Sequence, residues 1–65
     1  MEPPIAELSS ISATLDEITK RVGALALQAA DQGAEELAGD LFSIERALGG
    51  AGRRMAKLVS SGHKR

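Results

Sequence analysis

Two rows of apolar residues with heptad spacing, separated by one short glycine-containing segment, are the strongest constraint on how this chain folds. The first seam contains Leu8, Ile11, Leu15, Ile18, Val22, Leu25 and Ala29. The second seam contains Ala34, Leu37, Leu41, Ile44, Leu48, Ala51, Met55 and Leu58. Steps of three and four residues alternate along both seams, which places each seam on one face of a helix, as in coiled coils. The spacing therefore predicts two amphipathic helices.

Proline and glycine set the expected ends of these helices. Pro4 suits the first turn of a helix, because its ring fixes φ and its missing N–H is not needed there. We expect a first helix over about 4–31, a tight turn in which Gly33 takes the left-handed conformation, and a second helix over about 34–60. A short basic tail over residues 61–65 completes a single domain that spans residues 1–65.

Three glycines between residues 49 and 52 are the weak point of the second helix. Keeping Gly49, Gly50 and Gly52 helical costs roughly 2–3 kcal/mol relative to alanine. A hinge that divides the helix is one interpretation. The seam, however, continues in register through this segment to Met55 and Leu58, which favours a continuous but soft helix.

Folding the chain at the turn brings the two seams together. An antiparallel arrangement pairs Leu8 with Leu58, Leu15 with Ala51 and Val22 with Ile44, so that one turn satisfies every layer. The sequence therefore predicts an all-α fold, an antiparallel two-helix hairpin of coiled-coil type.

A second row of small or apolar residues flanks each seam, and an isolated hairpin would expose it to water. We predict that this row is a self-association face through which a homodimer forms a four-helix bundle, with Ile5, Ala26, Ala38, Phe42, Gly49, Gly52 and Val59 as its residues. Phe42 is interpreted as a buried contact at this face, with an anchor for a different protein as the alternative. A hetero-oligomer, in which another protein covers the face, also stays open.

The residues that enzymes use for catalysis are scarce in this sequence. The single histidine, His63, lies in the basic tail, no serine or threonine has a candidate base near it, and cysteine is absent. Acidic residues such as Glu35, Glu36 and Asp40 fall off the seam and lack the Glu-x-x-His spacing of bundle metal sites. We therefore expect no enzyme activity, no cofactor and no metal, and instead a protein–protein interaction module that acts as a small adaptor or regulator.

Charge is distributed unevenly along the chain. Residues 1–45 carry a net charge of −7 and residues 46–65 carry +6. The basic residues Arg46, Arg53, Arg54 and Lys57 are the candidate contacts for an anionic partner, so a nucleic-acid-binding regulator is the alternative function. Neither aromatic residues for base stacking nor helix-turn-helix spacing accompany them.

The N-terminal residues and the apolar runs bear on localisation. The start of the chain does not show a basic region followed by an apolar region, so no secretory signal is predicted. No apolar run approaches the roughly 18 residues of a membrane span. We expect a cytoplasmic protein without membrane contact.

Two segments carry a resemblance to other proteins. Residues 15–22, LDEITKRV, and residues 40–48, DLFSIERAL, resemble short uncharacterised helical-hairpin proteins of high-GC Gram-positive bacteria. The resemblance covers most of residues 8–59. It implies a bacterial helical hairpin and no known activity.

Overall fold

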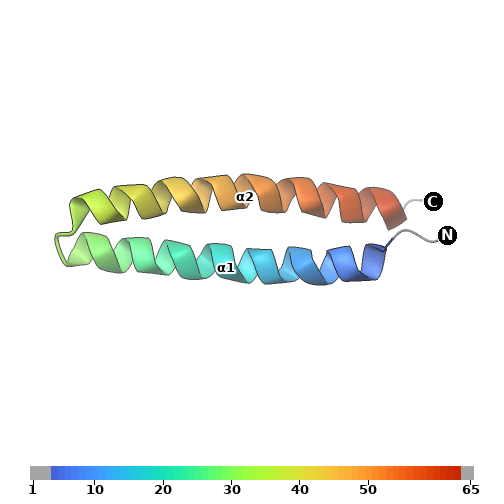
Figure 1. Cartoon of the computed structure of the whole chain (residues 1–65), viewed down its shortest axis with the longest axis horizontal. Coiled ribbons are helices and arrows are strands. Elements are labelled where there is room, and N and C mark those ends of the chain that lie inside the picture. Colours follow the sequence, from blue (N-terminus) through green and yellow to red (C-terminus); the bar gives the residue numbers. More distant parts are fainter. Residues whose placement is uncertain (1–3, 64–65) are drawn as a thin grey trace.

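The chain forms two long antiparallel helices joined by a short turn, as seen in a computed structural model that describes residues 4–63, with side chains through residue 62 (Figure 1). Helix α1 spans Ile5–Asp31 and helix α2 spans Glu35–His63. The molecule measures 51 × 15 × 14 Å, so it is an elongated rod. The predicted all-α hairpin is confirmed.

Helix α2 differs in one respect from the expected helix over 34–60. It passes without interruption through Gly49, Gly50 and Gly52, which confirms the continuous interpretation. It then extends beyond Ser60, through Gly62, to His63, so the first part of the predicted tail is helical. Residues 64 and 65 of that tail lie outside the described residues. Gly62 meets the tip of the Ile5 side chain, so the last turn of α2 packs against the start of α1.

The turn between the helices is a Schellman motif. The Ala34 N–H donates to the Ala29 carbonyl at 2.9 Å, and the Gly33 N–H donates to the Ala30 carbonyl at 3.1 Å. Gly33 has φ +79°, the predicted left-handed conformation. These bonds satisfy carbonyls that the end of α1 would otherwise leave without a partner.

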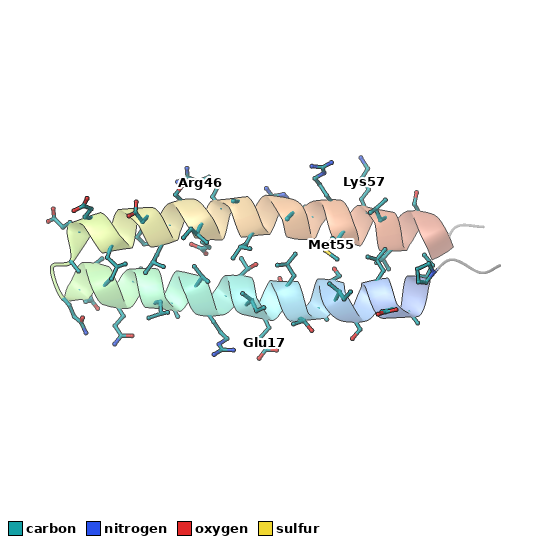
Figure 2. All side chains as sticks on the ribbon, in the orientation of Figure 1. Glu17, Arg46, Met55 and Lys57 are labelled. Carbon is teal, nitrogen blue, oxygen red and sulfur yellow. The ribbon has the colours of Figure 1, made fainter. Side chains whose placement is uncertain are left out.

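The rows of residues that lie between the two helices are not the same as the two predicted seams. On α1 the less exposed residues that face α2 are Leu8, Ser12, Leu15, Thr19, Val22, Ala26 and Ala29. On α2 the corresponding residues are Ala38, Leu41, Glu45, Leu48, Gly52, Met55 and Val59. Figure 2 shows Met55 pointing toward α1 and Glu17 pointing away from α2. Only half of each seam therefore lies in the hairpin interface.

Small residues explain this rotation of the helices. Ala26 is fully buried and Ala29 and Ala38 are 5% exposed, so the tightest packing lies near the turn and is made by alanines. Leu15 packs over Gly52, whereas the seams predicted that it would face Ala51. Short side chains let the helix axes approach closely, and the larger seam residues are left at the margin.

Candidate docking surface

The half of each seam that does not face the other helix forms an exposed apolar surface. Its six large residues, each between 41% and 58% exposed, are here called the apolar stripe: Ile11, Ile18, Leu25, Leu37, Ile44 and Leu58. The predicted seam pairs that placed these residues in the hairpin core are wrong. Single exposed leucines are common on proteins, but two rows of three large apolar residues at heptad positions, one on each helix, are not.

Helix geometry places both halves of the stripe on one face of the hairpin. On each helix the stripe row lies three residues after one interface row, as Ile11 follows Leu8 and Leu58 follows Met55. Successive residues of an α-helix are rotated by about 100°, so this offset turns the stripe to the same side of both helices. Because the two helices run antiparallel and share the offset, their stripe rows emerge on the same face of the molecule.

The opposite face is hollow and more polar. A groove of about 550 Å³ runs between the helices there, lined by small residues such as Ser12, Gly49, Gly52 and Ala56. The Thr19 hydroxyl beside it donates to the Leu15 carbonyl at 2.7 Å, so this half-buried polar group has its partner within α1. The hairpin therefore has one face that projects large apolar side chains and one that is recessed.

The predicted self-association face occupies a different place. Ala26 and Ala38 are buried between α1 and α2, Gly52 lies under Leu15, and both Ile5 and Val59 are half-buried at the same interface. Ala26 and Ala38 are therefore covered by the hairpin itself, whereas Gly52 and Val59 also line the groove on the recessed face.

Phe42 and Gly49, the other two predicted residues, lie on the recessed face. Phe42 is half-buried and lines a smaller hollow with Thr19, Glu45 and Arg46. Both Phe42 and Gly49 remain accessible there, but they sit on the opposite side from the apolar stripe.

The four basic candidates all lie on the side of α2 away from α1. Arg46 and Lys57 point away from α1 in Figure 2, and Arg53 belongs to the same side because it lies seven residues after Arg46. Arg54 is rotated by about 100° from Arg53, toward the apolar stripe. An ion pair is present on α1: Lys20 Nζ lies 3.5 Å from Oδ2 of Asp16, four residues earlier, and both side chains are well exposed.

Within the part of the chain that the structure describes, no three His, Cys, Asp or Glu residues come together as metal ligands. Neither described helix combines the length and apolar character that crossing a bilayer requires. Comparisons with models of protein families, with curated proteins and with solved structures gave no significant match. The apolar stripe is thus the feature on which a functional argument can rest.

The sequence contained a signal for the stripe that the seam prediction did not use. Each helix has two adjacent rows of mainly large apolar residues and, beside them, one row of mainly small residues. Ala26, Ala38 and Gly52 belong to the small row, and small residues favour close helix contact. Giving that row to the hairpin interface leaves one large row, the stripe, exposed.

Proposed function

We propose that this chain is a non-enzymatic protein–protein interaction module, a small cytoplasmic adaptor or regulator that acts by packing helices against helices. The observation that carries the proposal is the apolar stripe, six large side chains half exposed along one face of the hairpin. Rows of apolar residues at i, i+7 and i+14 on neighbouring helices are what a helical partner recognises.

The accessible surface of the chain supports association. The hairpin exposes 5157 Å². A compact monomer of 6.8 kDa exposes only about 3950 Å² by the usual scaling with mass, so roughly 1200 Å² is in excess. The elongated shape of the hairpin itself produces excess surface, and that surface leaves room for the ~800 Å² that each partner contributes to a standard stable interface.

The first partner that we propose is a second copy of the chain, in a four-helix bundle closed by the two stripes. A two-helix hairpin buries little by itself: the fully or nearly fully buried hydrophobic residues of the described part are three alanines. Burying the exposed half of each stripe side chain would contribute about 1 kcal/mol per residue. A second copy offers a matching surface without requiring any other protein.

Sedimentation equilibrium of matched variants tests this proposal. Ile18→Glu puts a charge in the middle of the stripe, and we expect it to convert a dimer to a monomer. Leu27→Glu is the control, because Leu27 is 62% exposed but lies two residues past Leu25, on another side of α1. A wild-type chain that is monomeric at all concentrations, or equal effects of the two variants, would overturn the proposal.

A nucleic-acid-binding regulator is the second candidate. The observation that favours it is the shared outward side of Arg46, Arg53 and Lys57 on a segment without acidic residues. Its mark would be binding of fluorescent single-stranded RNA or duplex DNA that falls steeply between 50 and 200 mM salt, values chosen to span the range of counterion effects. Absence of binding at low salt removes this candidate.

A further inference from the structure

The turn end of the hairpin is acidic. Between residues 22 and 44, around the turn, Asp31, Glu35, Glu36 and Asp40 occur without any basic residue. In the half away from the turn, the basic residues of α2 lie beside the acidic residues of α1 (Figure 1). Charge is therefore unbalanced mainly around the turn, at one end of a molecule 51 Å long.

The row that borders the stripe on α2 is acidic toward the turn and basic away from it. Asp40, Ala47 and Arg54 each lie three residues after a stripe-row position, on the side away from α1. Asp40 and Arg54 are seven residues either side of Ala47, so they stand about 21 Å apart along the helix, placed symmetrically around a small residue. When the same row of a second copy runs in the opposite direction, the acidic residue of each row faces the basic residue of the other.

Two hairpins can pack stripe to stripe in two closed ways. With the turns at opposite ends, α2 packs against the α2 of the second copy, and each α1 packs against the other α1. With both turns at the same end, α1 of one copy packs against α2 of the other. Either way, apolar residues meet apolar residues. In the first arrangement, for example, Leu37 meets Leu58.

Charge separates the two arrangements. With the turns at opposite ends, Asp40 of each copy meets Arg54 of the other, twice by symmetry, against one approach of the two Arg21 side chains, and the two acidic turn ends lie far apart. With the turns at one end, Asp40 faces Gln28, and the two acidic turn ends lie next to each other. Like charges brought together at an interface disfavour that arrangement.

We propose that the apolar stripe is covered by a second copy of the chain in the antiparallel arrangement, with the turns at opposite ends and Asp40 paired with Arg54 of the other copy. This inference rests on the proposed function, because it specifies how the proposed dimer is assembled. It assigns Ala47 to the point where the two α2 helices cross.

Cysteine cross-linking tests the arrangement directly, because the chain has no cysteine of its own. In the antiparallel dimer, Ala47→Cys places two thiols opposite each other at the crossing, and mild oxidation is expected to yield a disulfide-linked dimer on non-reducing electrophoresis. Ala56→Cys is the matched control: Ala56 is also exposed on α2, but it lines the groove on the opposite face, so it should remain unlinked.

Sedimentation of the same variants under reducing conditions separates the possible failures. A reduced Ala47→Cys protein that is dimeric but does not cross-link overturns the antiparallel arrangement and leaves the interaction module standing. Equal cross-linking of the two variants also overturns the arrangement. A reduced protein that is monomeric throughout, together with a monomeric wild type, overturns self-association itself.

Discussion

Leu15 of α1 packs directly over Gly52 of α2, with its Cδ2 atom 3.9 Å from the position that a Cβ atom at Gly52 would occupy. This is ordinary van der Waals separation, so one methyl group fits, whereas a larger side chain does not. The contact fixes how closely the two helices approach in the middle of the hairpin.

Substitutions at Gly52 test this fit. Gly52→Ala should raise the free energy of unfolding by about 1 kcal/mol, because alanine favours the helix and its methyl group meets Leu15 without a clash. Gly52→Leu should lower it by about 1–3 kcal/mol by forcing α1 and α2 apart. Urea denaturation followed by circular dichroism measures both. Stabilisation by leucine would show that the helices do not meet at this point.

In the turn, replacement of glycine by alanine should lower the free energy of unfolding, in contrast to the same change at Gly52. Gly33→Ala forces a side chain into the left-handed conformation at φ +79° and should cost about 1–2 kcal/mol. Gly39→Ala is the control, since nothing lies within 4 Å of its Cβ position and α2 should gain about 1 kcal/mol. Thermal unfolding of the two proteins checks the contrast. Equal shifts in melting temperature would contradict the Schellman geometry.

Gly23 and Glu45 should be energetically coupled across the interface. A Cβ at Gly23 would lie 2.6 Å from Glu45 Oε2, so the carboxylate must move when Gly23 becomes alanine. We expect Gly23→Ala to stabilise the hairpin more in a Glu45→Ala background than in the wild type. A double-mutant cycle from urea unfolding measures the difference. Additive effects would mean that the two residues are not in contact.

Exchange of charges beside the stripe should weaken and then restore the dimer. Asp40→Arg alone replaces two attractive pairs with two repulsive ones, and we expect the dimer dissociation constant to rise about 10-fold at low salt. The combination of Asp40→Arg with Arg54→Asp should return it close to the wild-type value. Sedimentation at 20 and 500 mM salt, chosen to bracket screening, measures the effect. Failure of the double variant to recover would contradict the Asp40–Arg54 pairing.

Much of the fold follows from the sequence, and the part that does not has a physical cause. The two helices, the turn at Gly33 and the continuity of α2 through its glycines could all be predicted, because periodicity and glycine chemistry act locally. The faces that meet could not be predicted from periodicity alone. Steps of three and four residues allow the Leu15 row to face α2 together with either neighbouring row, that of Ile18 or that of Thr19. The small side chains near Gly52 decide which of the two neighbouring rows faces α2.

The candidate site was affected by the same ambiguity. Assigning Ile18 and Leu25 to the hairpin core left Ala26 and Ala38 as the predicted docking residues, whereas in the structure Ala26 and Ala38 are buried and Ile18 and Leu25 are exposed. Whichever row lies in the hairpin interface, the sequence predicts one apolar face that no other part of the hairpin covers. The assignment of the interface rows changes only which residues form that face.

The antiparallel packing also predicts the order in which parts of the hairpin fold and unfold. Residues that share a layer are nearest in sequence beside the turn, at Ala29 and Ala38, and farthest apart at the open end, where Ile5 meets Gly62. Closing a short loop costs less entropy than closing a long one, so the hairpin should zip from the turn toward the termini and fray in the reverse order. Amide exchange would then be slowest beside the Schellman motif and fastest at the ends that carry the basic residues.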